Sequence, residues 1–496
     1  MILGKRGQRG AGRWPLVAAA VLGVVLAATV ASASVLAKPI GSDPYTNTSS
    51  QHKTQVEPDS FGFGSTIVGV FQTGRFFDGG ASNIAWSTSH DAGRTWTTGV
   101  LPGTTVYEGG TWARISDPAV AYDPLHDVWM VSGLAFGSAG SSLLGAPSAV
   151  VTSRSTDGGL TWQNPVTVSL TPTSFYDKNW IGCDTWSSSP YYGNCYTEWD
   201  DNGLGNLLEM STSTDGGLTW SAPVSPAGNP SGLGGQPVVQ PNGNVIVPYS
   251  ANDVAIRSFR STDGGASWST VTTVANITDH GVAGGLRTSP LPSAEVDGSG
   301  KVYVVWQDCR FRASCAQNDI VVSTSTDGLT WSAVTRIPID ATTSTVDHFI
   351  PGIAADTSIS GSSAHLALGY YYYPVSSCSS SSCQLTVGFV SSLDGGATWS
   401  APQQLSGPMS LAWIASTSQG RMVGDYMSTS FAGGTAHPVF AIAKALDGGV
   451  FQERAASATL DVTAPGLSRP VPATREQPVF RRHRPSRPRA RAISAF

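Results

Sequence analysis

Residues 155–162 read STDGGLTW, and near-copies of this eight-residue stretch return along the chain. We call each copy a box. The other copies, two of them weakened, are SHDAGRTW at 89–96, STDGGLTW at 213–220, STDGGASW at 261–268, STDGLTW at 325–331, SLDGGATW at 392–399 and ALDGGVF at 445–451. The box aspartates are 48 to 67 residues apart. Self-similarity at such a period indicates a repeat architecture.

The composition of the box is that of a β-turn between two strands. The carboxylate of Asp157 and the hydroxyl of Ser155 can hydrogen-bond to nearby backbone groups and close the turn. The glycines adopt positive φ without strain, and Trp162 offers a large ring to a neighbouring sheet. We therefore predict a structural role for the box aspartates, which are Asp91, Asp157, Asp215, Asp263, Asp327, Asp394 and Asp447.

With these boxes the chain resembles the Asp-box, or BNR-repeat, proteins of the sialidase (neuraminidase) superfamily. The resemblance implies an all-β fold, a β-propeller of four-stranded blades. One blade is laid out as strands at 292–296, 301–306, 319–325 and 330–337, with a box between the last two. Seven boxes favour seven blades; six is the alternative, because the sialidases of the superfamily are six-bladed. We expect a strand from the N-terminal end to close the ring.

The ends of the chain differ from its middle. Residues 1–37 combine Lys5, Arg6, Arg9 and Arg13 with an apolar run and predict a signal peptide, hence a secreted protein. The alternative is an uncleaved anchor, which would be the only route to a membrane. Residues 38–460 form the predicted propeller. Residues 461–496 are rich in Pro and Arg and predict a disordered tail.

The six cysteines fall into three close pairs, which favours an oxidising compartment. We predict local disulfides joining Cys183 with Cys195, Cys309 with Cys315 and Cys378 with Cys383. No Cys-x-x-Cys spacing occurs and the histidines are scattered, so we expect neither a metal site nor a cofactor.

Blade topology places the candidate chemistry on the face opposite the box turns. Loops that enter the first strands, or join the second strand to the third, converge there, as the groups of a ligand site do. The polar residues of these loops are Glu57, Asp59, Arg75, Asp78, Asp117, Asp177, Lys178, Glu198, Asp200, Asp201, Arg287, Asp308, Arg310, Arg312, Asp347, His348 and Arg421.

The sialidase resemblance implies roles for some of these residues. Family members use an aspartate as acid/base, a Tyr–Glu pair as nucleophile and three arginines for the substrate carboxylate. Asp78 and Tyr426 stand at the positions most similar to the acid/base and the nucleophile. Arg75, Arg287, Arg310 and Arg421 are the expected carboxylate binders. The family's Arg-Ile-Pro motif is missing, because residues 60–71 read SFGFGSTIVGVF.

Three functions remain open at this point. The first is a secreted sialidase-like glycoside hydrolase, whose specific form would be an exo-α-sialidase acting on terminal acidic sugars. The second is a non-catalytic extracellular propeller that binds carbohydrate or protein. The third is a hydrolase or lyase acting on another glycan, because fold alone does not settle function. We expect a carbohydrate or glycoconjugate partner, no nucleic acid and a monomeric protein.

Overall fold

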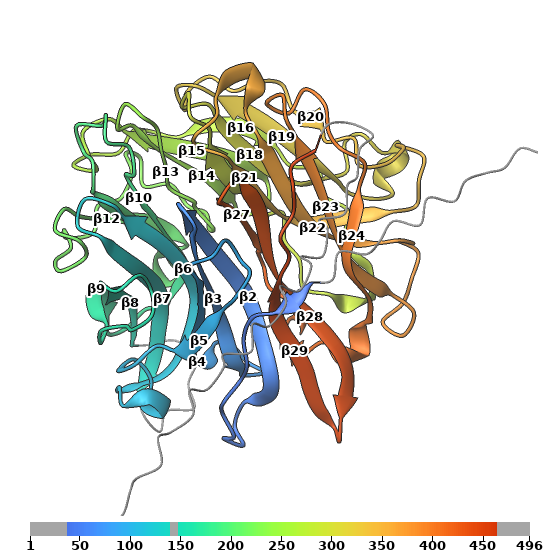
Figure 1. Ribbon diagram of the computed structural model, residues 1–496, viewed down its shortest axis with the longest axis horizontal. Helices are drawn as coiled ribbons and strands as arrows, with labels where there is room; N and C mark the ends of the chain where they lie inside the picture. Colours follow the sequence, from blue (N-terminus) through green and yellow to red (C-terminus); the bar gives the residue numbers. More distant parts are fainter. Residues whose placement is uncertain (1–36, 139–146, 464–496) are drawn as a thin grey trace, which may run out of the picture. The chain divides into compact units, whose positions relative to one another are not determined.

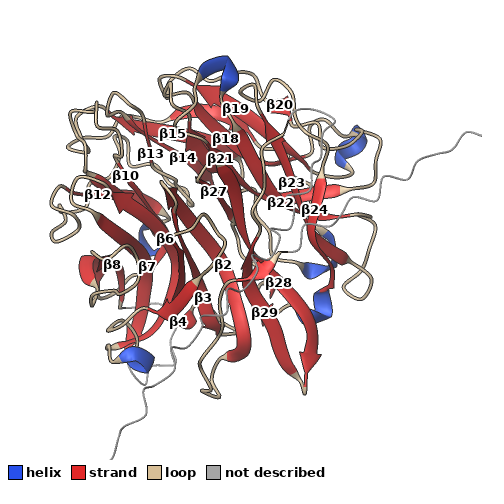
Figure 2. Ribbon diagram, viewed as in Figure 1, coloured by secondary structure: helices blue, strands red, loops and turns tan. Residues whose placement is uncertain are grey.

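The computed structural model describes residues 37–138 and 147–463. The predicted signal peptide and nearly all of the predicted tail fall outside these residues, so both stay predictions. The described secondary structure is β-strand with a few single turns of 3-10 helix, which confirms the all-β prediction (Figure 2). No helix in the described ranges is long and apolar enough to cross a membrane.

The strands pair antiparallel, each mainly with the next along the chain (Figure 1). The N-terminal part forms one eight-stranded sheet, made of β2 (Gln51–Phe63), β3 (Thr66–Arg75), β4 (Ala81–Ser89), β5 (Thr97–Val100), β6 (Trp112–Asp123), β7 (Val128–Ser138), β8 (Ser148–Ser155) and β9 (Val166–Thr171). A three-stranded sheet follows, with β10 (Tyr176–Cys183), β11 (Cys195–Asp201) and β12 (Leu207–Ser213).

Four sheets of four strands complete the fold. The first two contain β13 (Val238–Val239), β14 (Val245–Ala251), β15 (Ala255–Ser261) and β16 (Thr272–Asn276), then β17 (Ser293–Val296), β18 (Val302–Asp308), β19 (Asp319–Ser325) and β20 (Thr335–Arg336). The last two contain β21 (Asp347–Ala355), β22 (Leu366–Tyr373), β23 (Gln384–Ser392) and β24 (Gln403–Ser410), then β27 (Ser428–Ala432), β28 (Thr435–Asp447), β29 (Val450–Ser457) and β1 (Lys38–Pro39).

The remaining elements are short. A two-stranded ribbon is formed by β25 (Ser416–Thr417) and β26 (Gly420–Arg421). The 3-10 turns of the described chain are η1 (Val106–Glu108), η2 (Asn202–Leu204), η3 (Ala283–Gly285), η4 (Ala313–Cys315), η5 (Gly361–Ser363) and η6 (Leu411–Trp413).

The propeller fold is confirmed, but the predicted blade count is wrong. We expected seven separate four-stranded blades, or six, whereas the described strands form five separate sheets of three or four strands, a two-stranded ribbon and one sheet of eight strands. The large sheet arises because β4 and β6 pair at one point, Ala81 with Ile115. That single pair joins β2–β5 and β6–β9, two four-stranded meanders, into one hydrogen-bonded sheet.

The first strands of successive meanders contact one another and close a ring. This order runs β2, β6, β10, β13, β17, β21, β27 and back to β2. The N-terminal β1 completes the last sheet by pairing with β29, Lys38 opposite Ser457. In Figure 1 the blue β2 accordingly lies beside the red β28 and β29. We call the line through this ring the ring axis.

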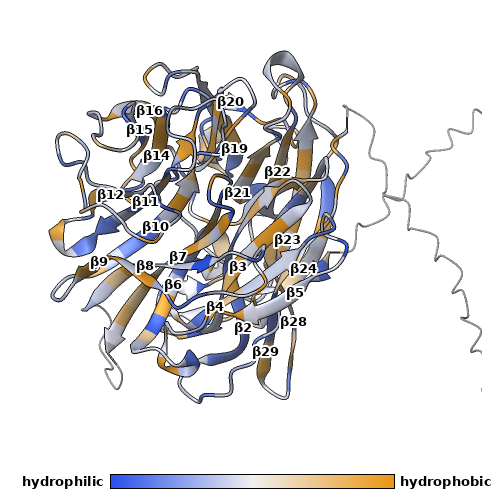
Figure 3. Ribbon diagram, turned by 60° about the vertical axis from the view of Figure 1, so that its left-hand side comes forward, coloured by the Kyte–Doolittle hydropathy of each residue, from blue (hydrophilic) through white to orange (hydrophobic). Residues whose placement is uncertain are grey.

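Hydrophobic residues are concentrated on the strands (Figure 3). The buried ones pack in clusters between neighbouring meanders. Val68, Trp86, Val131 and Trp162 belong to one such cluster. Trp162 is a box tryptophan, and its ring lies 6.4 Å from that of Trp86. The box tryptophans thus bury apolar area between consecutive meanders, as their ring size predicts.

The box turns are closed by side chains, as the sequence predicted. In the box at 155–162, Asp157 Oδ1 accepts hydrogen bonds from the Ser155 hydroxyl at 2.8 Å and from the Thr161 N–H at 2.9 Å. The Thr161 hydroxyl donates to Oδ2 at 2.6 Å. Ser155 Oγ in turn accepts from the Gly159 N–H at 2.9 Å. The same pattern of Asp acceptor and Ser partner recurs at Asp91, Asp215, Asp263, Asp327 and Asp394. The prediction is not met at Asp447, because Ala445 replaces the serine and no hydrogen bond to this carboxylate is found among the described residues.

The box turns also dock on the preceding meander. The Thr88 hydroxyl of β4 donates to the Gly159 carbonyl at 2.6 Å. Gly159 has φ of 84°, and a Cβ there would come within 2.8 Å of Val68. Only glycine therefore fits this turn, both for its backbone conformation and for its close approach.

The three predicted disulfides are confirmed. Cys183 pairs with Cys195, Cys309 with Cys315 and Cys378 with Cys383. Each lies within one meander, so the disulfides hold local loops and leave the sheets free of covalent links to one another.

Removal of a box carboxylate should destabilise the fold. We expect Asp157→Ala, and likewise Asp215→Ala, to lower the free energy of unfolding by ~1–3 kcal/mol, because backbone donors lose their acceptor. Asp447→Ala is the matched control, since no hydrogen bond to this carboxylate is found among the described residues. It should change stability by less than ~0.5 kcal/mol. Urea denaturation measures the three variants, and equal losses in all of them would contradict the role assigned to the box.

The pH dependence of this contribution follows from its pKa. Burial alone would raise the pKa of Asp157, but hydrogen bonds from Thr161 and Ser155 lower it to about 2 from 3.8. The stabilisation is therefore present above the unfolded pKa and is lost as pH falls through about 2. The difference between the wild type and Asp157→Ala should accordingly shrink in acid.

Candidate functional site

Three charged residues occupy bulges at matching points of the first strands. The pairing register shifts between Val56 and Asp59 in β2, between Ser116 and Ala119 in β6, and between Asp177 and Trp180 in β10. The bulged positions hold Glu57, Asp117 and Lys178, with φ of 52°, 47° and 49°. A bulge re-aims the side chain that it carries, and these left-handed conformations cost roughly 1–3 kcal/mol each.

The three side chains meet in a buried ion cluster. Lys178 Nζ lies 3.0 Å from Asp117 Oδ1 and 3.4 Å from Glu57 Oε1. It also contacts Asp425, which lies just before β27 and is ion-paired with Arg287. We call these five residues the ion cluster. Because buried charges lose their hydration, such a cluster persists only when its members satisfy one another.

A pocket of about 340 Å³ opens over the ion cluster. Its walls come from β2, β3, β6, β7 and β10, from the segments that follow β3, β9, β11 and β16, and from the chain between β25 and β26. The lining residues are Glu57, Arg75, Asp78, Gly79, Gly80, Ser116, Asp117, Phe136, Phe175, Asp177, Lys178, Asn202, Arg287, Ser418 and Gln419. The pocket therefore combines a charged floor with an aromatic wall at Phe136 and Phe175, whose rings meet edge to face.

The carboxyl groups of the site differ in their affinity for protons. Burial, with help from Asp117, raises the pKa of Glu57 to about 8, although Lys178 opposes the shift. Burial raises the pKa of Asp177 to about 6. Burial would also raise the pKa of Asp425, but Lys178 and Arg287 hold it well below its usual range. The pocket thus holds Glu57, which stays protonated near neutral pH, beside Asp177, whose lower pKa leaves it ionised there.

The structure brings three of the predicted site residues together. Arg75, Asp78 and Arg287 all line the pocket. Asp78 is ion-paired with Arg114 at 2.6 Å, and Arg75 donates to the Gly80 carbonyl at 2.8 Å. Two arginines and an aspartate predicted from sequence therefore do share one site.

The other three predicted site residues do not line this pocket. The Tyr426 hydroxyl donates to the Pro118 carbonyl at 3.2 Å, and burial together with nearby acids raises its pKa far above the usual value. Arg421 donates to the Ile414 carbonyl at 2.6 Å. Arg310 is ion-paired at 2.7 Å with Asp308, the last residue of β18 and the neighbour of the disulfide-closed loop. These contacts hold the three side chains in the protein framework.

The ion cluster was only partly visible in the sequence. Glu57, Asp117 and Lys178 appeared among the polar loop residues, but nothing singled them out, and Asp425 was missed. A signal did exist, because Glu57 and Asp117 both directly precede a proline at the first strand of a meander. The bulges turn these side chains toward one point only in the folded ring, so this convergence cannot be read from the sequence.

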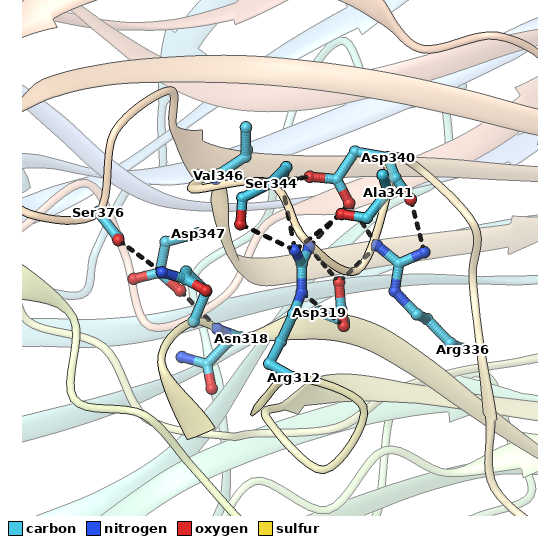
Figure 4. Close-up of polar contacts among 11 residues, drawn as sticks. Arg312, Asn318, Asp319, Arg336, Asp340, Ala341, Ser344, Val346, Asp347 and Ser376 are labelled. Atoms are coloured by element: carbon cyan, nitrogen blue, oxygen red, sulfur yellow. Dashed lines mark hydrogen bonds and ion pairs between the residues drawn. The ribbon is translucent and has the colours of Figure 1, made fainter. Parts of the chain in front are cut away.

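A second charged cluster lies near the loop closed by Cys309 and Cys315 (Figure 4). Arg312 is ion-paired with Asp319 at 2.6 Å and with Asp340 at 2.7 Å, and Arg336 pairs with Asp319 at 2.8 Å. The buried His348 completes a trio of potential metal ligands with the two aspartates. Both carboxylates already accept from guanidinium groups, so a cation here would face two positive charges. The cluster fits a structural brace better than a metal site.

A comparison with known protein families finds a match that covers part of the repeat region. Residues 191–352 match the family model described as a BNR repeat-like domain. The resemblance to BNR-repeat proteins is confirmed. The match includes the boxes at 213–220, 261–268 and 325–331. No curated protein matches the chain.

Solved structures with a similar fold include two sialidases and a glycosidase of other specificity. Hadza microbial sialidase Hz136 is 14% identical with a TM-score of 0.44, over 83% of this chain and 66% of that one. The NanB sialidase from Streptococcus pneumoniae is 13% identical with a TM-score of 0.45, over 86% and 71%. The α-L-arabinofuranosidase Arb93A from Fusarium graminearum is 14% identical with a TM-score of 0.45, over 86% and 98%. Likenesses this distant carry no activity over to this chain.

Stability should fall as the solution becomes alkaline. The raised pKa values of Glu57, Asp177 and the nearby Asp59, about 8, 6 and 7, mean that the folded protein holds protons that the unfolded chain has released. Each such group stabilises fully below its unfolded pKa and loses that contribution as pH rises through its folded pKa.

We therefore expect a higher melting temperature at about pH 5 than at about pH 8. Calorimetry on the wild type and on Glu57→Gln tests this expectation. The variant lacks one titrating group and should show a smaller difference between the two pH values. A wild-type melting temperature that rises over this interval would show that the buried carboxyls do not hold their protons.

Proposed function

We propose that this chain binds a glycan in the pocket over the ion cluster and hydrolyses its terminal glycosidic bond. The observation that carries the proposal is the split in proton affinity among carboxyl groups of one pocket. Glycoside hydrolysis generally needs one carboxylic acid to protonate the leaving oxygen and one carboxylate on the other side of the reaction. Environments that push the pKa values of neighbouring groups apart supply such a pair.

Glu57 is the proposed proton donor. Its pKa of about 8 keeps it protonated at neutral pH, and it lines the pocket. Asp117, ion-paired with Lys178 at 3.0 Å, and Asp177 are the proposed carboxylates. Asp78 is the alternative donor suggested by the sialidase resemblance. Its side chain is 40% exposed, but its ion pair with Arg114 would be broken by protonation.

An acidic sugar is the proposed substrate class. Arg75 and Arg287 both line the pocket, and the side chain of Arg287 is 21% exposed. A guanidinium group matches the fork geometry of a carboxylate. This keeps an exo-α-sialidase-type activity as the specific form of the proposal, with Tyr426 assigned no role as nucleophile because its hydroxyl is bonded to the backbone.

A non-catalytic glycan-binding propeller is the second candidate. The observation that favours it is the mutual pairing of the floor charges, since Lys178, Asp117, Asp425 and Arg287 already satisfy one another. The same pocket could then hold a sugar without acting on it. Turnover separates the two candidates.

The test of the hydrolase proposal is a panel of fluorogenic glycosides that contains an α-sialoside and an α-L-arabinofuranoside. We expect turnover of at least one, and loss of general-acid catalysis in Glu57→Gln should lower kcat by roughly 100-fold or more. Glu453→Gln is the matched control, because Glu453 is also buried with a pKa of about 8 but does not line the pocket. A larger loss in Asp78→Asn than in Glu57→Gln would reassign the donor. Sugar binding with no turnover on any glycoside would leave the non-catalytic candidate.

The acidic-sugar proposal has its own test. Arg287→Ala should weaken binding of an acidic sugar about tenfold or more, because a charge-assisted hydrogen bond contributes ~1.5–3 kcal/mol. A matched neutral sugar should lose much less. Arg310→Ala is the control, since this arginine is paired with Asp308 outside the pocket. Calorimetry with the two sugars measures the losses, and equal effects on both would refute a carboxylate clamp.

A further inference from the structure

A second cavity lies on the ring axis, on the other side of the bulges from the pocket. Along β2, Glu57 lines the pocket, whereas Asp59 and Phe61 line this cavity. β6 and β10 do the same. Asp117 and Lys178 line the pocket, whereas Val120 and Trp180 line the second cavity. Residues from all the first strands of the ring line the cavity.

The cavity has an inner part and a mouth. The inner part holds about 100 Å³ and the mouth about 360 Å³. Both are lined by Phe61, Trp186 and Glu295, so they adjoin, and we call the two together the axial cavity. Its size is that of a small ligand site.

The axial cavity carries acidic groups without basic ones. Asp59 and Glu295 line its inner part and Asp356 its mouth, whereas no Lys, Arg or His is found among the described residues that line it. Neither Asp59 nor Glu295 takes part in an ion pair within the described ranges. The pocket on the other side of the bulges is lined by two arginines and a lysine. The described residues therefore supply no counter-charge for these carboxyl groups, although the Val120 N–H donates a hydrogen bond to Asp59 at 2.8 Å.

The mouth of the axial cavity is aromatic. Phe61, Trp186 and Phe431 line it and are each half-buried, while Phe63 is 42% exposed at its edge. The face of an aromatic ring attracts a cation, and this attraction is strongest when the cation is poorly hydrated, as an alkylated ammonium is. Aromatic rings together with carboxylates are what an organic cation requires, whereas a divalent metal ion needs a dense shell of oxygen ligands.

We propose that the axial cavity is a second binding site, which takes a small organic cation with a substituted ammonium group. The ammonium group lies toward Glu295 and Asp59, and its alkyl substituents lie against Phe61, Trp186 and Phe431. This site is independent of the proposed hydrolase function, because it shares no lining residue with the pocket.

The proton affinity of the two carboxyls agrees with the proposal. Burial, with help from Asp59, raises the pKa of Glu295 to about 8, and burial raises that of Asp59 to about 7. A bound cation supplies the missing counter-charge and favours their ionised forms.

The test uses choline and the uncharged alcohol in which a carbon atom replaces the choline nitrogen. Isothermal titration of the full chain at about pH 9, above the pKa of both carboxyls, should show choline binding and at least tenfold weaker binding of the alcohol. Glu295→Gln should weaken choline about tenfold or more. This substitution mimics the protonated side chain, so the variant should fold, and circular dichroism checks that it does. Glu453→Gln is the matched control, because Glu453 is buried but lines neither the axial cavity nor the pocket, and this variant should bind choline as the wild type does.

Two further measurements distinguish an organic-cation site from a metal site or a non-specific cavity. Phe431→Leu keeps an apolar side chain but removes the aromatic face, so choline should bind several-fold more weakly. Calcium chloride is titrated in parallel. Calcium binding that depends on Glu295, with no response to choline, would overturn the proposal in favour of a metal site. Equal binding of choline and the alcohol, or no binding of either, would also overturn it.

Discussion

The hydrogen bonds inside the box turns hold the third and fourth strands of a meander together and seat each turn on the meander before it. Asp157 accepts from the backbone and from Thr161, while the carbonyl of Gly159 accepts from Thr88 of the preceding meander. The same few side chains therefore fix the local turn and the contact between sheets. Because this unit recurs along the chain, the ring is built from nearest-neighbour contacts, and β1 with β29 is the pairing that brings the two ends together.

The ring that results holds its buried acids in two different ways on the two sides of the bulges. On one side of the bulges Lys178, Arg75 and Arg287 balance the acids of the pocket. On the other side Asp59 and Glu295 face a cavity with no basic residue among its described lining. Removing charged groups from water is unfavourable unless a partner replaces the lost hydration. In the pocket, internal ion pairs replace the lost hydration. In the axial cavity, the carboxyl groups avoid the cost by holding protons or, as proposed, by pairing with a bound cation.

Three of the strained backbone positions carry charged residues of the ion cluster. Glu57, Asp117 and Lys178 have positive φ in strands that are otherwise extended. Non-glycine residues keep such conformations only where the surrounding structure enforces them, and they are concentrated at functional sites. Here the strain accompanies side chains that meet at one point, which the regular alternation of a strand would direct to opposite faces. The stability of the sheets thus offsets the free-energy cost of the positive-φ conformations at these three bulges.

The sequence by itself determined the repeat, the all-β propeller fold, the role of the box aspartates and the three local disulfides. Each of these depends on residues close together in the chain, so Ser155, Asp157 and Gly159, or Cys378 and Cys383, reveal it directly. The sequence also placed Arg75, Asp78 and Arg287 on one face, and the three line one pocket. Only the tertiary structure decided that two meanders fuse through Ala81 and Ile115, that Arg310 is paired with Asp308, and that Glu57, Asp117, Lys178 and Asp425 meet. The physical reason is that these outcomes depend on bulges and on contacts between meanders distant in sequence, where a shift of one residue redirects a side chain.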